Sequence, residues 1–317
     1  MDQDSKQFMA FLREGTVGGL QTIPKSDLHN HAGRGGSLRY ISDWANTEIS
    51  PPKAPFASLD KMQDWFEQNI KKHCPGLQGY LKRIEASFAQ AREDSILRLA
   101  LSFGLGEVEA LGGMKPFMQA MDTLHEAYAP KTALLPELAL DRACDAEQVY
   151  DIVEEVLSYR WFASIDICCN EFAQPIRPFQ RIYRLANEMG VIRKAHAGEF
   201  GTAEDVLEAC DLLELQEVHH GIAAAASELA MKWLARNKIR LNVCPTSNVM
   251  LQRVKGYREH PIRVLYDHGI PVTINTDDML IFNQSVSQEY MNLYQAGLMT
   301  PEELDEIRLI GLKPYQK

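Results

Sequence analysis

Residues 162–196 read FASIDICCNEFAQPIRPFQRIYRLANEMGVIRKAH, and this stretch decides the fold. Phe162–Cys169 is a run of buried-strand type, and Val191–His196 is a second strand-like run. Between them, Pro178–Met189 has helical spacing and is followed by Gly190, a residue type that commonly ends helices. A strand, a helix and another strand in this order predict two parallel strands joined by a crossover helix.

The same alternation extends in both directions along the chain. The expected strands are Ser26–His31, Ile96–Leu105, Ala133–Leu140, Phe162–Cys169, Val191–His196, Glu217–Gly221, Ile239–Cys244 and Pro271–Thr276. The expected helices include Lys115–Tyr128, one that starts at Asp145 with Gln148 three residues later, Pro178–Met189, Thr202–Leu213, Ser227–Asn237 and Pro261–His268. Eight such units predict an α/β fold of the TIM type, a closed (β/α)8 barrel, with a doubly wound open sheet as the alternative.

The chain has one irregular region, the first connection at Arg34–Gln90, which is far longer than a usual strand-to-helix loop. Long connections of this kind are commonly lids or binding loops, so we expect a lid here. No linker, low-complexity segment or internal repeat divides the sequence. We therefore expect one barrel domain over residues 1–317.

The composition narrows the class of partner. The chain has 43 acidic and 33 basic side chains, a net charge of −10 and no Lys/Arg cluster, which argues against nucleic acid or an anionic membrane. It has no apolar run of the ~20 residues that a spanning helix needs, and no signal-peptide pattern. Six cysteines without a CxxC motif indicate reduced thiols. We expect a cytoplasmic enzyme with a small-molecule substrate, and homo-oligomerisation stays open.

Six side chains fall at the expected carboxyl ends of strands: His29 and His31 at the first, His196 at the fifth, His220 at the sixth, and Asp277 and Asp278 at the eighth. Strand alternation places His29 and His31 on one face. In a (β/α)8 barrel the carboxyl ends of the strands converge on the catalytic face, so residues distant in sequence meet there. Imidazole nitrogens and a carboxylate suit Zn²⁺ or another borderline divalent metal.

Each element also has an ordinary structural explanation. An H-x-H pair can belong to packing, and His196 or His220 can be a core histidine bonded to backbone. Glu199, three residues after His196, can be a helix N-terminal carboxylate, and Asp278 can hold a loop. The metal-site interpretation is favoured because all these residues coincide with strand ends. Beside a metal, Glu199 becomes a candidate general acid or base.

The ordered motifs resemble the adenosine deaminase-like family of the amidohydrolase superfamily. They are His29-Asn30-His31, His196-Ala197-Gly198-Glu199, His220-Gly221, Cys244-Pro245-Thr246-Ser247-Asn248, His260-Pro261 and Asn275-Thr276-Asp277-Asp278. The match runs from about Pro24 to Phe282. The resemblance implies a (β/α)8 barrel with one divalent metal ion, usually zinc, and hydrolytic removal of ammonia from an aminopurine-type ring.

The resemblance also implies roles for individual residues. The metal ligands would be His29, His31, His196 and Asp277. The catalytic set would be Glu199, which protonates the ring nitrogen beside the reacting carbon, His220, which orients the attacking hydroxide, and Asp277. Asp278 would bond another ring nitrogen, and Gly198 would lie against the substrate.

This chemistry is physically coherent. A metal brings the pKa of bound water from ~15.7 to near 7, and protonating the ring lowers the cost of losing aromaticity. Glu199 must therefore hold a proton in the complex, which a closed apolar site favours.

Two departures from the family fall on substrate contacts. Gly33 stands where adenosine deaminases carry an Asp that binds the ribose 5′-hydroxyl. Cys169 stands where they have a Gly whose backbone approaches the purine, so its side chain would crowd the ring. His219 also replaces a usual Gly. The pattern favours deamination of a substrate other than plain adenosine.

Arg34 follows Gly33 at the expected mouth of the site. It is either a solvated loop arginine or a guanidinium that clamps a carboxylate or phosphate, and our hypothesis is that the substrate bears an anionic group. Trp65 and Phe66 fall where family members keep an apolar lid, although core packing explains them equally well.

Two other functions stay open: a superfamily hydrolase of another C–N or ester bond, and a non-catalytic ligand-binding barrel. The retained Glu199, His220 and Asp278 speak against the second. The sequence has neither the H-x-E and P-C-x-x-C signature of the other zinc deaminases nor a phosphate-binding glycine motif.

Overall fold

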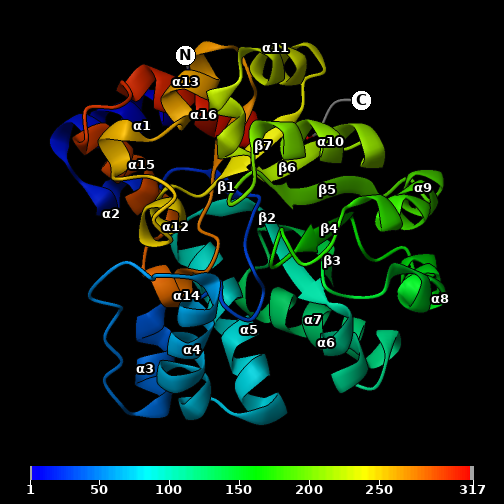
Figure 1. The fold of residues 1–317 in the computed structure, drawn as a ribbon. Coiled ribbons are helices and arrows are strands. Elements are labelled where there is room, and N and C mark those ends of the chain that lie inside the picture. The colour runs from blue at the N-terminus through cyan, green and yellow to red at the C-terminus, as the bar shows by residue number, and fades with distance from the viewer. Residues whose placement is uncertain (1, 315–317) are drawn as a thin grey trace.

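Eight parallel strands form one sheet in the order of the chain, and the sheet curls into a barrel surrounded by helices (Figure 1). The structure is a computed structural model and describes residues 2–314. The strands are β1 Lys25–Asp27, β2 Ile96–Gly104, β3 Ala133–Asp141, β4 Ser164–Cys168, β5 Ile192–Ala197, β6 Glu217–His220, β7 Arg240–Val243 and β8 Val272–Ile274. Each strand pairs with the next one in sequence, which confirms the expected (β/α)8 barrel. The alternative, a doubly wound open sheet, would not have its strands in chain order.

The expected helices are present, with others at both ends of the chain. Their bounds are α1 Gln3–Glu14, α2 Val17–Leu20, α3 Leu38–Ala45, α4 Leu59–Asn69, α5 Gly76–Glu93, α6 Leu105–Ala110, α7 Met114–Tyr128, α8 Ala146–Ser158, α9 Gln180–Glu188, α10 Ala203–Leu213, α11 Glu228–Arg236, α12 Pro245–Met250, α13 Ile262–Asp267, α14 Met279–Phe282, α15 Val286–Gln295 and α16 Pro301–Leu312. Four short 3-10 helices are η1 Lys71–His73, η2 Arg177–Phe179, η3 Ile222–Ala226 and η4 Tyr257–Glu259.

The boundary signals in the sequence act as expected. The Asp145 side chain accepts hydrogen bonds from the backbone N–H groups of Glu147 and Gln148 and so caps α8. Gly190 follows α9 with a φ of 75°, a left-handed conformation that glycine adopts without strain.

The first strand is shorter than the expected Ser26–His31, because regular pairing stops at Asp27. There the Leu28 N–H turns to the side-chain oxygen of Asn275, which takes the place of a ladder partner. Farther on, the Asp277 N–H donates to the His29 carbonyl at 3.0 Å and the His31 N–H donates to the Asp277 carbonyl at 3.2 Å. The barrel therefore closes between its first and last strands at the H-x-H motif itself.

The long first connection forms α3, α4 and α5, which Figure 1 shows together on one side of the barrel. Its apolar side chains, such as Ile41 and Phe66, make a small core of their own with Leu280 and Ile281 of α14. Helix α4 borders the large cavity described below. A lid that opens and closes stays a prediction.

The barrel interior is polar beneath the carboxyl ends of the strands, although such barrels usually fill this space with branched apolar side chains. Glu137 accepts from Lys194 Nζ at 2.8 Å and lies 3.0 Å from His219 Nε2. Arg240 pairs with Glu217 in the same layer. These buried charges are tolerated because they are paired. The network holds the His219 ring 3.9 Å from the ring of His29, directly beside the expected metal ligands.

Within residues 2–314, no helix has both the length and the apolar character to cross a membrane. The six cysteines are all free thiols.

Candidate active site

The four expected metal ligands converge at the carboxyl ends of the strands. Nε2 of His29 and Nε2 of His31 lie 3.3 and 3.2 Å from Asp277 Oδ1. The His196 ring centroid is 4.7 Å from that of His29. His29, His196 and Asp277 are buried, so these polar groups face one another away from solvent.

The cluster fits a divalent cation. Both ring nitrogens of His29 are buried and make no regular hydrogen bond among the described residues; the Nε2 atom has Asp277 Oδ1 at 3.3 Å, and Nδ1 has no partner. Burial, together with His219, holds the pKa of His29 well below its usual range, so the ring is neutral and keeps a lone pair. Nδ1 of His196 lies 2.9 Å from Asp166 Oδ2, which leaves its Nε2 for a ligand bond. Burial lowers the pKa of His31 and His196, but the neighbouring carboxylates outweigh it and raise these values to about 9 and about 10, so a bound cation would displace a proton from each ring. Imidazoles without that proton, together with one carboxylate, are a donor set that zinc prefers.

Asp166 is a functional candidate that the sequence analysis did not single out. It is fully buried in β4, and its contact fixes the orientation of the His196 ring. A lone carboxylate within a buried strand is itself a signal, because such groups are almost never buried without a partner.

Glu199 is held in place by a second carboxylate, that of Glu171 in the loop after β4. Glu171 Oε1 accepts from the N–H groups of Glu199 and Phe200 at 2.9 and 2.8 Å, and Oε2 accepts from Gly198 at 2.7 Å. Gly198 has a φ of 71°, and a Cβ there would lie 2.3 Å from a Val206 methyl group. Glycine is therefore required for the turn, and a contact between Gly198 and substrate stays a prediction.

The surroundings of Glu199 favour a carboxyl that holds a proton. Burial raises its pKa well above the usual value, and the nearby Asp277 carboxylate raises it further. Glu199 Oε2 lies 3.6 Å from His220 Nε2, and Oε1 accepts from the Asn248 side chain at 3.4 Å. Both effects favour the protonated form of Glu199, the form that protonation of a ring nitrogen demands.

A hydrogen-bond chain fixes which nitrogen of His220 carries hydrogen. The Ile262 backbone N–H donates to His260 Nδ1 at 3.1 Å, so the neutral His260 ring carries its hydrogen on Nε2. This nitrogen donates to Asn248 Oδ1 at 3.2 Å, and the Asn248 amide then donates to His220 Nδ1 at 3.1 Å. Burial lowers the pKa of both histidines to about 3, so both are neutral. His220 therefore presents an Nε2–H donor toward Glu199.

Three of the strand ends are strained. Cys169, His220 and Asp277 follow or end β4, β6 and β8 with φ values of 75°, 60° and 62°, in the left-handed region. This conformation costs free energy for residues other than glycine, and such strain often marks functional sites. At Cys169 the backbone conformation is one that favours glycine, and the thiol lies 3.4 Å from the sulfur of Cys168.

A cavity of about 600 Å³ opens above these groups, within the size range of small-molecule sites. The cavity is lined by the expected site residues His31, Gly33, Arg34, Cys169, His196, Glu199, His220, Asp277 and Asp278. Met62, Gln63 and Phe66 of α4 form its wall on the side of the first connection. Phe66 is buried in this wall, which agrees both with an apolar lid and with core packing. Trp65 is partly buried and does not line the cavity.

Arg34 lines the cavity, and its side chain is 26% exposed; its role toward a substrate stays a prediction. Its Nη1 lies 3.2 Å from Asp278 Oδ2, its Nη2 donates to Gln63, and the guanidinium lies 4.6 Å from the centre of the Phe66 ring. The other Asp278 oxygen, Oδ1, is buried and has no hydrogen-bond partner within residues 2–314. Arg34 therefore holds one oxygen of Asp278 and leaves the other for a ligand.

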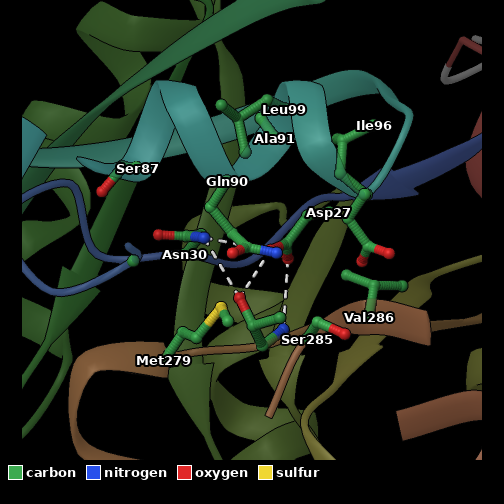
Figure 2. Close-up of a pocket in the computed structure, with 13 residues that line it drawn as sticks. Asp27, Asn30, Ser87, Gln90, Ala91, Ile96, Leu99, Met279, Ser285 and Val286 are labelled. Atoms are coloured by element: carbon green, nitrogen blue, oxygen red, sulfur yellow. Dashed lines mark hydrogen bonds between the residues drawn. The ribbon is translucent and has the colours of Figure 1, made fainter. Parts of the chain in front are cut away.

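A second, much smaller cavity lies behind the H-x-H motif (Figure 2). Its volume of about 10 Å³ has room for about one water molecule, so it is not a substrate site. Figure 2 shows Asn30 and Asp27 directed toward each other, with a bond of 3.0 Å from Asn30 Nδ2 to Asp27 Oδ2. Thr276 bonds to both, which ties the segment before Asp277 to the H-x-H motif.

A (β/α)8 barrel with a histidine and aspartate cluster at the carboxyl ends of its strands defines a metal-dependent hydrolase of the amidohydrolase type. The family model for adenosine deaminase matches residues 114–314, which is more than half of the chain. The chain belongs to the adenosine deaminase family.

Two curated relatives extend this similarity over most of the chain. An adenosine deaminase of Clostridium acetobutylicum is 36% identical, with 86% of each chain covered. An adenine deaminase of Ralstonia pickettii is 26% identical, with 87% of this chain and 85% of that protein covered. Family membership makes the protein a hydrolase that acts on C–N bonds.

Solved structures share the fold at low sequence identity. An adenine deaminase from Arthrobacter aurescens has a TM-score of 0.77 at 22% identity, covering 91% of this chain and 92% of that one. An amidohydrolase from Burkholderia ambifaria, solved with bound zinc, has a TM-score of 0.74 at 20% identity, covering 94% and 86%. An Arabidopsis N6-methyl-AMP deaminase has a TM-score of 0.76 at 18% identity, covering 92% of each. These likenesses support the barrel fold alone.

Proposed function

We propose that this protein is a metal-dependent deaminase that releases ammonia from a purine-like or related N-heterocyclic amine. The observation that carries the proposal is the position of Glu199. Its buried carboxyl, whose pKa is raised by burial, lies beside His220 and Asp277 in the wall of the large cavity. The relatives named as adenosine and adenine deaminases support the same class of reaction.

One divalent ion, with zinc as our proposal, would be held by His29, His31, His196 and Asp277. The buried ring nitrogens of His29, which make no regular hydrogen bond among the described residues, support this assignment, and so does the zinc bound in the similar Burkholderia structure. When bound, such an ion lowers the pKa of a coordinated water from ~15.7 toward 7 and thus supplies a nucleophile at neutral pH.

We assign the remaining steps of the reaction to Glu199, His220 and Asp278. Glu199 gives its proton to the ring nitrogen next to the amino-bearing carbon, which makes that carbon more electrophilic. The His220 Nε2–H donates toward the attacking oxygen and stabilises the charge that develops there. Asp278, whose Oδ1 is buried and has no hydrogen-bond partner within residues 2–314, forms a hydrogen bond with a second ring nitrogen. The net reaction consumes one water, replaces the amino group by oxygen and releases one ammonia.

We also propose that the substrate is not plain adenosine and that it carries an anionic group near Arg34. Gly33 offers no side chain to a ribose hydroxyl, and its carbonyl is engaged by Arg83 at 2.9 Å. An anionic group would share Arg34 with Asp278, which already lies 3.2 Å from the guanidinium. The Arg34→Ala variant should then lose about tenfold more kcat/KM on a nucleotide than on its nucleoside. Equal losses on both would contradict the anionic group.

The acidic composition and free thiols support a cytoplasmic location, which cell fractionation would test. We further propose that residues 1–317 act as one domain without a nucleic-acid partner.

The direct test is ammonia release from a panel of aminopurines, nucleosides, nucleotides and pterins by the purified, zinc-loaded protein. We expect stoichiometric ammonia from at least one purine-like amine. Turnover of an ester or amide without ammonia from any heterocyclic amine would favour another superfamily hydrolase.

A further inference from the structure

Two adjacent cysteines, Cys168 and Cys169, lie in the wall of the large cavity and take no part in the proton transfers described above. Successive residues of a strand direct their side chains to opposite faces, so neighbouring cysteines in a strand keep their sulfurs apart. Here Cys168 ends β4, and Cys169 follows it with a left-handed φ of 75°. With this turn of the chain, the two sulfur atoms meet at 3.4 Å.

The pair also differs from most of the other cysteines in its access to small molecules. Cys169 is exposed and Cys168 is half-buried, and both line the cavity. Cys74, Cys210 and Cys244 are buried. A small oxidant that enters the cavity therefore reaches two thiols that already touch each other.

The hydrogen bond between the two sulfurs makes the thiols unequal. It lowers the pKa of Cys169 and raises the pKa of Cys168, which burial raises further. The thiolate is the nucleophilic form of cysteine, so Cys169 is the sulfur that reacts first. An accessible cysteine of lowered pKa beside a second thiol is the arrangement of redox-sensing pairs.

We propose that Cys168 and Cys169, together named the β4 dithiol, are a modification site at which a peroxide forms a reversible disulfide. First, the Cys169 sulfur attacks a peroxide oxygen: an S–O bond forms, the O–O bond breaks, and the second oxygen leaves as water with the thiol proton. Next, the Cys168 sulfur attacks the Cys169 sulfur: an S–S bond forms, the S–O bond breaks, and the hydroxyl leaves as water with the Cys168 proton. Two thiols and one hydrogen peroxide give one disulfide and two waters.

This disulfide is of a labile kind. The Cα atoms of adjacent residues are about 3.8 Å apart, whereas disulfides usually join Cα atoms about 4.4–6.8 Å apart. A bond formed outside this range is strained, and strained or exposed disulfides are the easily reduced ones. The β4 dithiol is therefore suited to reversible oxidation, with free thiols as the resting state.

Oxidation also reaches Glu199 through the loop after β4. The disulfide needs the sulfurs at about 2 Å instead of 3.4 Å, and Cys169 has to move because Cys168 is held in the ladder with β3. Glu171 lies two residues further on, and its carboxylate accepts from the N–H groups of Glu199 and its neighbours. We expect the disulfide to displace Glu171 and to slow turnover. This consequence, unlike the oxidation itself, rests on the proposed function.

The experiment treats the reduced, zinc-loaded protein with hydrogen peroxide, blocks the remaining thiols and digests the protein with trypsin. Both cysteines fall in the tryptic peptide 161–181, which contains no other cysteine and no methionine. We expect this peptide to carry no blocking group and to be lighter than the reduced peptide by two hydrogen atoms. Dithiothreitol before blocking should restore both thiols. An unoxidised peptide, or one that gains oxygen without a disulfide, would overturn the β4 dithiol.

Single substitutions separate the roles of the two sulfurs. In Cys168→Ser, Cys169 should stop at the sulfenic acid, which dimedone captures as an adduct. In Cys169→Ser, Cys168 should stay a thiol at the same peroxide concentration, and its oxidation there would contradict Cys169 as the reacting sulfur. Cys144→Ser is the matched control, because Cys144 is half-buried in the loop after β3. It should form the disulfide as the unmodified protein does.

Turnover is a separate measurement. On an accepted substrate, peroxide should lower kcat by at least about tenfold, and dithiothreitol should restore it. Cys169→Ser should be insensitive to peroxide, whatever its own kcat. A disulfide in a protein that deaminates no aminopurine would support the β4 dithiol and contradict the proposed function. A disulfide with unaltered kcat would leave the proposed function intact and contradict the effect on Glu199.

Discussion

The Glu171 carboxylate accepts a hydrogen bond from the backbone N–H of Glu199 at 2.9 Å, and its two oxygens also bind the N–H groups on either side. Glu171 lies in the loop after β4, 28 positions before Glu199 in sequence. Glu199, which we propose as the proton donor, is thus positioned through its main chain by a buried group that does not itself line the cavity.

We predict that Glu171→Ala lowers kcat by about 10- to 100-fold with little loss of zinc, because three backbone N–H groups, one of them buried, lose their acceptor and the Glu199 turn loosens. The measurements are kcat and metal content. Glu171→Gln retains one acceptor oxygen and should recover part of the rate. Loss of zinc in parallel with activity would show that Glu171 supports the metal site instead.

The hydrogen-bond chain that ends on His220 gives a second prediction. Asn248→Ala leaves buried nitrogens of His260 and His220 without their partner, so we expect a stability loss of about 1–3 kcal/mol and a lower kcat. Asn248→Asp would place a carboxylate against His220 Nδ1 and should favour the opposite tautomer, with hydrogen on that nitrogen. Both variants are measured by thermal unfolding and by kcat. Unchanged kcat in Asn248→Asp would contradict the role of the tautomer.

These two predictions show where sequence reasoning stops. The metal cluster could be predicted from His29, His196 and Asp277, because strand ends in a parallel barrel must converge. The roles of Glu171 and Asn248 could not, because they depend on which buried N–H or ring nitrogen each side chain meets. That is decided by tertiary packing between segments far apart in the chain.

The end of the first strand illustrates the same limit. Spacing placed His29 and His31 correctly on one face, but pairing stops at Asp27, where an Asn275 side chain replaces a backbone acceptor. Likewise, Ser102 falls in an apolar run as an ordinary strand residue. Only its buried hydroxyl, which has no hydrogen-bond partner within residues 2–314, distinguishes it.

Glu289 predicts a pH dependence of stability away from the metal cluster. Burial raises its pKa to about 8 from a usual 4.5, although its oxygens accept from the Thr246 N–H. The folded state therefore keeps this proton over a range where the unfolded state has lost it. Stability falls as pH rises from 4.5 toward 8, by up to about 1.4 kcal/mol per unit.

The matched variant is Glu289→Gln, which cannot titrate and keeps an acceptor oxygen for Thr246. Denaturant unfolding between pH 5 and about 8 should show that the difference between the two proteins grows in favour of the variant. A constant difference across this range would mean that the pKa of Glu289 is not raised.

Cys169 predicts a gain of stability on substitution. Its left-handed φ of 75° disfavours any side chain, so Cys169→Gly should raise stability by up to about 1 kcal/mol and widen the cavity next to Glu199. Cys168→Gly is the control, since Cys168 has no positive φ and should lose stability instead. Thermal unfolding and the relative kcat/KM of adenine and adenosine are the measurements. A destabilised Cys169→Gly variant would contradict the strain at this position.

The most direct measurement of the central claim is ammonia release by zinc-loaded protein in which Glu199 is replaced by Gln. The unmodified protein should convert at least one aminopurine-like substrate with one ammonia per molecule. Glu199→Gln should fold, retain zinc and lose about 100- to 10,000-fold in kcat, because it has no carboxyl proton to give to the ring. Near-normal ammonia release by this variant with full zinc content would contradict the assignment of Glu199 as the acid.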